Sequence, residues 1–178
     1  MTAAARSIRS VEEAVALLKE LGAPPRLVTH GRLVAEAADL LLTKLRKLGI
    51  AIDEPWVRAG AVLHDVGKIQ HPAELDAPGA AHEEAGLALL LARGIDPRIA
   101  RCCVSHAAWQ KMECSLEEIL VALADGLWKG VRRPVLEGRV IVEIAERSER
   151  DRWAAFVELD TCFEEIADDG PGRLLRSR

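Results

Sequence analysis

The sequence predicts an all-α protein of one domain, and three observations support that fold class. Apolar residues recur at spacings of three and four along most of the 178-residue chain, as the buried face of an α-helix requires. Prolines, glycines and capping residues divide the chain at short intervals, where helices begin and end. No stretch of useful length shows the alternation of apolar and polar residues that a half-buried strand needs.

The N-terminal third of the chain is predicted to form three helices. A capping box at residues 10–13 opens the first helix, and the second runs from the prolines at 24–25 to Gly49. Asp53 caps a third helix, which carries a run of apolar residues and ends near Gly67. Each boundary follows from a residue whose backbone preference or side chain starts or stops a helix.

The rest of the chain is predicted to hold a loop, five helices and a tail. Two prolines and a glycine make residues 69–80 a loop. The helices are expected over residues 81–93, 96–106, 115–128, 135–149 and 151–167. Residues 169–178 are polar, and we expect them to form a C-terminal tail that frays. One domain is therefore expected over residues 1–168.

Composition and charge narrow the function classes. The net charge of −4 argues against general nucleic-acid binding, which needs a basic surface. No apolar run reaches the roughly 18 residues of a membrane span, and the first ten residues lack the apolar core of a secretory signal. The four cysteines form no paired framework, which indicates reduced thiols and a cytoplasmic protein. A homodimer remains open, with the last two helices as a dimer surface or as packing.

Ionisable residues follow two apolar runs. His64 and Asp65 come directly after residues 59–63, and Asp125 comes directly after residues 120–124. A buried ionisable pair is unfavourable unless a partner neutralises it. A divalent metal ion provides that neutralisation, because it binds neutral imidazole and carboxylate ligands. The alternative is a solvated helix end with ordinary polar residues.

Three further histidines lie on predicted helices. His30 is in phase with an apolar stripe, His82 begins a helix, and His106 ends one. Each alone is compatible with an ordinary core histidine, but a helical bundle can bring all of them to one point, so the set predicts a metal site. His71 lies in the loop and is expected to be exposed. A zinc site with Cys103 and His106 is an alternative, although no second ligand pair has matching spacing.

An ordered pattern in the sequence resembles the HD superfamily of metal-dependent phosphohydrolases. It consists of His30, the His-Asp pair at 64–65, and Asp125. The segment Leu-His-Asp-Val-Gly-Lys at 63–68 closely resembles the signature at the centre of that family. The resemblance covers roughly residues 26–130, and it implies an HD-domain-like helical bundle with its metal site in that region.

The resemblance implies ligands for two metal ions. The first ion would be bound by His30, His64, Asp65 and Asp125. The second would be bound by His82 and His106, with Asp65 as a bridge between the two ions. Both ions are expected to be iron or manganese, and zinc, nickel, cobalt and magnesium are alternatives.

Catalytic and substrate-binding residues follow from the same resemblance. Asp65 and Lys68 would be catalytic, with Lys68 contacting the phosphate or helping the leaving group to depart. Lys129, Arg132 and Arg133 follow Asp125 and are expected to receive an anionic ligand together with Lys68. The alternative for these cations is that they only balance the dipole at a helix C-terminus.

The expected function is hydrolysis of a small phosphate ester or nucleotide by a metal-activated water. His106 is followed by Ala-Ala-Trp-Gln, without the GYP segment of the HD-GYP branch, which disfavours cyclic-di-GMP as the substrate. One alternative is an HD-type diiron oxygenase that cleaves a carbon–phosphorus or carbon–carbon bond. Another is a helical ligand-binding or regulatory protein with a vestigial metal site.

Overall fold

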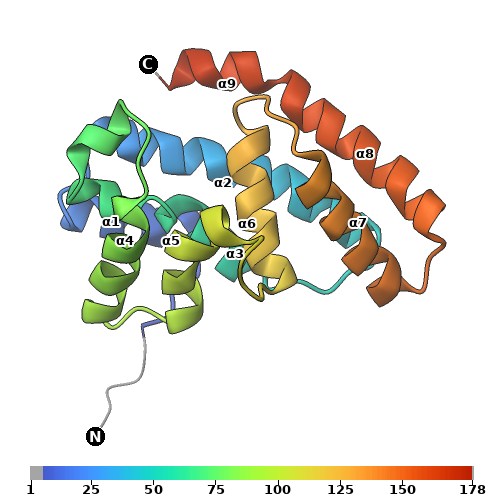
Figure 1. Cartoon of the computed structure of the whole chain (residues 1–178), viewed down its shortest axis with the longest axis horizontal. Coiled ribbons are helices and arrows are strands. Elements are labelled where there is room, and N and C mark those ends of the chain that lie inside the picture. Colours follow the sequence, from blue (N-terminus) through green and yellow to red (C-terminus); the bar gives the residue numbers. More distant parts are fainter. Residues whose placement is uncertain (1–5, 178) are drawn as a thin grey trace, which may run out of the picture.

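The computed structural model describes residues 6–177, and over that range it is helical (Figure 1). The α-helices are α1 (Val11–Glu20), α2 (Pro25–Lys47), α3 (Glu54–Leu63), α4 (Ala81–Ala92), α5 (Pro97–Ala108), α6 (Leu116–Leu127), α7 (Pro134–Ser148), α8 (Arg152–Asp168) and α9 (Gly170–Arg176). Two short 3-10 helices, η1 (Val66–Ile69) and η2 (Pro72–Leu75), lie between α3 and α4. The all-α fold class is confirmed, since residues 6–177 contain one isolated β-bridge and no strand.

The predicted helix starts match the local capping contacts. The Ser10 hydroxyl accepts a hydrogen bond from the backbone N–H of Glu13 at the start of α1. At the start of α6, Ser115 and Glu118 form both hydrogen bonds of a capping box. Such contacts satisfy backbone N–H groups that have no partner within the helix, so a few neighbouring residues are enough to define where a helix begins.

The third helix is shorter than predicted, and the 69–80 loop is more ordered. The helix α3 ends at Leu63, and the chain continues as η1 and then η2. Gly67 packs directly against α4, where a Cβ atom would clash with the carbonyl oxygen of His82. The chain therefore turns after residue 63 so that η1 lies against α4, a contact that no local pattern announces.

The core forms where α2 and α6 meet the neighbouring helices. The long helix α2 contacts α1, α3, α6 and α8, and α6 contacts α2, α3, α5, α7 and α8. Ten of the twelve residues of α6 are buried. Because these two helices carry His30 and Asp125, the rigid centre of the protein also holds two of the predicted metal ligands. No helix within residues 6–177 is long and apolar enough to cross a membrane.

The C-terminal segment corrects one prediction. Residues 170–176 form α9, which extends from α8 along one edge of the molecule, so the expected fraying tail is wrong for this stretch (Figure 1). Arg173 is completely buried, and its guanidinium donates hydrogen bonds to the carbonyl oxygens of Ile166 and Trp128. A tertiary anchor therefore orders a segment that is polar in sequence. Residues 1–5 of the expected domain and residue 178 of the expected tail lie outside the described residues.

Candidate metal centre

Six ionisable side chains converge on one region of the core from four helices and the turn after α3. His30 comes from α2, His64 and Asp65 directly follow α3, and the others lie on α4, α5 and α6. The full set is His30, His64, Asp65, His82, His106 and Asp125. These are the six residues predicted from the sequence as metal ligands.

One cluster brings His30, His64 and Asp65 together with Asp125. Asp65 Oδ2 lies 3.1 Å from His30 Nε2 and 3.7 Å from His64 Nε2. The two imidazole nitrogens are themselves 3.3 Å apart. On the other side, Asp125 Oδ1 lies 3.6 Å from His64 Nε2 and 3.9 Å from His30 Nε2. His30, His64 and Asp65 thus form a group that could hold a metal ion, and Asp125 lies against its two histidines.

A second cluster uses the other oxygen of the same aspartate. Asp65 Oδ1 lies 3.1 Å from His82 Nε2 and 3.8 Å from His106 Nε2. The two clusters thus meet at Asp65, with one carboxylate oxygen turned toward each. Each cluster is a group that could hold a metal ion, and Asp65 belongs to both.

Hydrogen bonds determine which nitrogen of three histidines is free. Nδ1 of His64 lies 2.9 Å from the carbonyl oxygen of Ala61, and Nδ1 of His106 lies 2.9 Å from that of Cys102. Nδ1 of His82 lies 2.5 Å from a carboxylate oxygen of Glu74. Because a carbonyl or carboxylate oxygen only accepts, Nδ1 carries the proton in each case. In the neutral ring, Nε2 then presents a lone pair toward Asp65.

The arrangement fits a metal ion better than it fits the protein alone. Lone pairs on Nε2 that face carboxylate oxygens repel them unless a positive charge lies between. His82 Nε2 is buried, and with the proton on Nδ1 it has no hydrogen-bond donor among the described residues, since the Asp65 oxygen it faces can only accept. Buried polar atoms of this kind are rare, and a metal ion would satisfy this one. Imidazole and carboxylate donors suit iron, manganese, zinc and related ions, so the donor set leaves the metal open.

The pKa shifts show the same need for positive charge. Burial raises the pKa of Asp65, but positive charge on His64 and the close contacts of His30 and His82 outweigh it and hold that pKa well below its usual value. Burial lowers the pKa of His64, but the charges of Asp65 and Asp125 overcome it and raise the value. The two buried carboxylates thus favour positive charge beside them.

His106 behaves differently from the other ligands. Burial, reinforced by the charge of His64, lowers the pKa of His106 to about 4. Its ring is therefore neutral near pH 7, which is the protonation state that binds a metal ion.

Three of the four predicted substrate-binding cations lie at the site. Lys68 Nζ is 2.6 Å from Asp65 Oδ2. Lys129 Nζ and one guanidinium nitrogen of Arg133 lie 4.0 and 3.8 Å from Asp125 Oδ2. Each of these three side chains is between 20% and 35% exposed, so their charges border the buried cluster on its solvent side.

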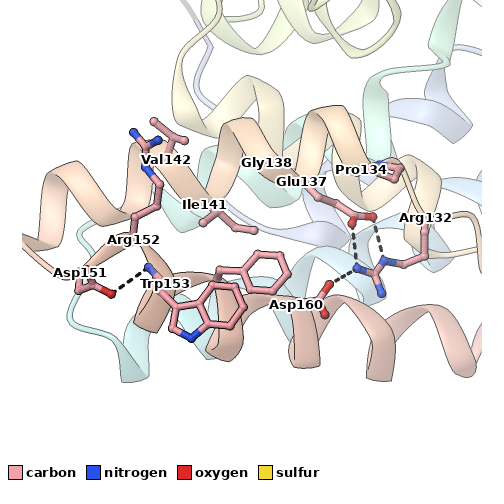
Figure 2. A pocket seen from close by; sticks show the side chains of 11 residues that line it. Arg132, Pro134, Glu137, Gly138, Ile141, Val142, Asp151, Arg152, Trp153 and Asp160 are labelled. Atoms are coloured by element: carbon pink, nitrogen blue, oxygen red, sulfur yellow. Dashed lines mark hydrogen bonds and ion pairs between the residues drawn. The ribbon is translucent and has the colours of Figure 1, made fainter.

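The fourth cation, Arg132, does not join them. Its guanidinium bonds both oxygens of Glu137, at 2.9 and 2.8 Å, and also pairs with Asp160 at 2.5 Å. Figure 2 shows these contacts at one end of a pocket of about 730 Å³ between α7 and α8, lined also by Trp153. That Arg132 receives the anionic ligand stays a prediction, and this geometry does not favour it because Glu137 and Asp160 already neutralise the guanidinium.

One prediction is corrected, one alternative loses support, and one residue was missed. His71 is half-buried rather than exposed, and it belongs to neither cluster. The alternative zinc site loses support because the Cys103 thiol bonds the carbonyl oxygen of Leu63, and burial raises its pKa. Glu74, which bonds His82, was assigned only to a loop, and no periodicity or spacing marks it as part of the site.

Comparison with known proteins points to one family. The family model of the HD domain matches residues 11–128. A Thermoplasma volcanium protein named tRNA (cytidine(56)-2'-O)-methyltransferase is 31% identical over 136 residues, which cover 68% of this chain and 37% of that protein. The uncharacterized protein MJ0778 of Methanocaldococcus jannaschii is 30% identical over 137 residues, covering 68% of this chain and 77% of the relative. No solved structure matches.

Proposed function

The chain belongs to the HD-domain family, and we propose that it is a metal-dependent phosphohydrolase or phosphodiesterase that acts on a small phosphate ester or nucleotide. One observation carries the proposal: a buried cluster of histidines and aspartates is bordered by cations. Lys68 contacts the shared carboxylate of Asp65, while Lys129 and Arg133 flank Asp125. A site of this kind attracts a group with several negatively charged oxygens, as a phosphate has.

The proposed chemistry divides between the metal ions and the protein. Divalent ions, when bound, supply Lewis-acid stabilisation of phosphoryl oxygens and lower the pKa of water so that hydroxide is available near neutral pH. The six ligand residues would hold these ions, with the two oxygens of Asp65 turned toward different clusters. Asp65 would thereby contribute one carboxylate oxygen to each of the two clusters.

Lys68 would contact both Asp65 and the substrate. An ammonium group has three donors, and only Asp65 takes one of them among the described contacts. The remaining donors are free to bond a non-bridging phosphate oxygen or the oxygen of the leaving group. Lys129 and Arg133 would neutralise further charge on the substrate, which favours nucleotides and phosphate esters over uncharged molecules.

The activity named for the Thermoplasma relative is not carried over. The chain spans 37% of that protein, so the shared segment does not show which part performs the named methyl transfer. The second relative has no named activity. The proposal therefore depends on the residues of this chain and on the family to which it belongs.

A substrate panel tests the proposal directly. Purified protein is loaded with manganese or with ferrous iron and assayed without oxygen on p-nitrophenyl phosphate, bis-p-nitrophenyl phosphate and nucleotides. We expect release of nitrophenol, phosphate or a nucleoside monophosphate, and loss of that release in His64→Ala and Asp65→Ala. Lys68→Ala removes a cation at the site. Arg132→Ala removes a cation outside the site and is its matched control.

The alternatives predict different results in the same assay. A diiron oxygenase would turn over only with oxygen and ferrous iron. A protein with a vestigial site would bind no transition metal in stoichiometric amount and hydrolyse nothing on the panel. Either result would refute the phosphohydrolase proposal.

A further inference from the structure

Glu74 lies outside the predicted ligand set but directly behind one ligand. Its Oε2 accepts a hydrogen bond from His82 Nδ1 at 2.5 Å and another from the His82 backbone N–H at 3.1 Å. Its Oε1 accepts from the backbone N–H of Ala81 at 3.1 Å. The side chain is only 14% exposed, and its two contacts with His82 are partly buried.

These contacts join two separate segments of the chain. Glu74 belongs to η2, whereas Ala81 and His82 form the first turn of α4. The N-cap residue of α4, Ala80, supplies no side-chain hydrogen bond to this helix. Glu74 therefore caps the start of α4 in place of a local residue and at the same time holds the imidazole of His82.

The three histidines with an oriented Nδ1 differ in what orients them. His64 and His106 bond carbonyl oxygens three and four residues earlier in the chain, so their own helical segments set the rings. His82 depends on a carboxylate from η2. The first cluster is thus built without any contact to Glu74, whereas the second needs it to aim His82 Nε2 at Asp65 Oδ1, 3.1 Å away.

We propose that Glu74 is a positioning residue for the second metal ion: it orients His82 and thereby sets the affinity of the His82–His106 cluster. The inference rests on the metal site of the proposed function and not on the reaction. A carboxylate behind a ligand histidine holds its tautomer and ring orientation and makes it a stronger donor, and loss of such a partner lowers metal affinity by about 10- to 100-fold.

A neighbouring glycine offers a second way to disturb the contact. A Cβ atom at Gly79 would overlap the Glu74 carboxylate and its methylene group, and no other atom is as close. The backbone at residue 79 is not in the left-handed region, so alanine is tolerated there conformationally. Gly79→Ala would therefore push the carboxylate away from His82 without changing any charge.

The test compares metal binding in four variants. Glu74→Gln removes the charge and Gly79→Ala displaces the group. Glu84→Gln, on the exposed side of the first turn of α4, is the control for lost charge. Gly138→Ala, where an added Cβ meets open space, is the control for an added methyl group. Each metal-free protein is titrated with Mn²⁺, bound metal is counted by elemental analysis, and thermal unfolding of the metal-free form is recorded.

The expected result is specific to one ion. Wild type and both controls should bind two Mn²⁺ ions, while Glu74→Gln and Gly79→Ala should bind the second ion about 10- to 100-fold more weakly and the first ion as before. The proposal is overturned if both test variants bind like wild type, if they lose both ions together, or if wild type binds fewer than two. A purely structural role would lower the unfolding temperature of the metal-free variants without separating the two ions, and that outcome also overturns it.

The same experiment keeps this inference apart from the proposed function. If wild type hydrolyses a substrate but Glu74→Gln and Gly79→Ala bind metal like wild type, the proposed function stands and the role of Glu74 is refuted. If wild type binds two ions and the variants bind the second more weakly, but no substrate is hydrolysed, the role of Glu74 stands and the proposed function is refuted.

Discussion

Replacing Arg173 by alanine is expected to destabilise the protein by about 3 kcal/mol, the lower end of the range for breaking a buried ion pair. The guanidinium is buried, donates to the carbonyl oxygen of Ile166 at 2.7 Å, and lies 3.3 Å from Glu36 Oε1. Hydrogen bonds to charged groups contribute about 1.5–3 kcal/mol each, and an unsatisfied buried carbonyl adds a further penalty. The lower end applies because Glu36 keeps access to water after the change.

Arg176 provides a matched control on the same helix. It pairs with the same Glu36 carboxylate, at 2.8 and 2.7 Å, but its side chain is 53% exposed. Exposed ion pairs contribute little because water and salt screen them. Arg176→Ala should therefore change stability far less than Arg173→Ala, even though its hydrogen bonds to Glu36 are shorter.

Urea unfolding, followed by far-UV circular dichroism on the metal-free proteins, measures the difference. With a slope of about 1–3 kcal/mol per molar urea, the Arg173→Ala midpoint should fall by about 1–3 M. The reasoning is refuted if the two variants lose the same stability, because burial of the guanidinium would then not be what anchors α9. A loss limited to a small helical signal at low urea would refute it as well, since α9 would then fray independently of the core.

Three further predictions follow from the site and the surface. His82→Ala and His106→Ala should each lower bound metal from near two ions to near one, measured by elemental analysis, and unchanged metal in both would contradict a dinuclear site. Arg133→Ala should raise KM for an anionic substrate while Arg132→Ala leaves it close to wild type, and equal effects would contradict the placement of these arginines. The homodimer remains a prediction: wild type should sediment as a dimer and Trp153→Glu, at a 69% exposed aromatic on α8, as a monomer, whereas a monomeric wild type at high concentration would exclude it.

Local signals were enough for most of the secondary structure. The starts of α1, α3 and α6 follow from Ser10, Asp53 and Ser115, whose side chains accept hydrogen bonds from backbone N–H groups three residues ahead. The end of α3 was not predictable, because it depends on Gly67 approaching α4. The helix α9 was not predictable either, since its polar sequence is ordered by a contact with the distant Glu36.

The candidate ligands could be found from sequence because their chemistry conflicts with their surroundings. Histidines and aspartates in apolar helices, such as His64 and Asp125, stand out against the pattern of the core. Arg132 could not be separated from Arg133 in this way, because the two are adjacent and equally charged. Only the packing of α7 and α8 supplies Arg132 with Glu137 and Asp160 as partners.

The sequence by itself determined the all-α class, most helix boundaries and the six ligand candidates, because each depends on periodicity, capping or residue chemistry within a short stretch. The tertiary structure decided how those candidates divide into two clusters around the two oxygens of Asp65. It also decided which cations border them and that Glu74 stands behind His82. These features depend on hydrogen bonds and ion pairs between separate elements, whose partners are chosen by packing rather than by spacing along the chain.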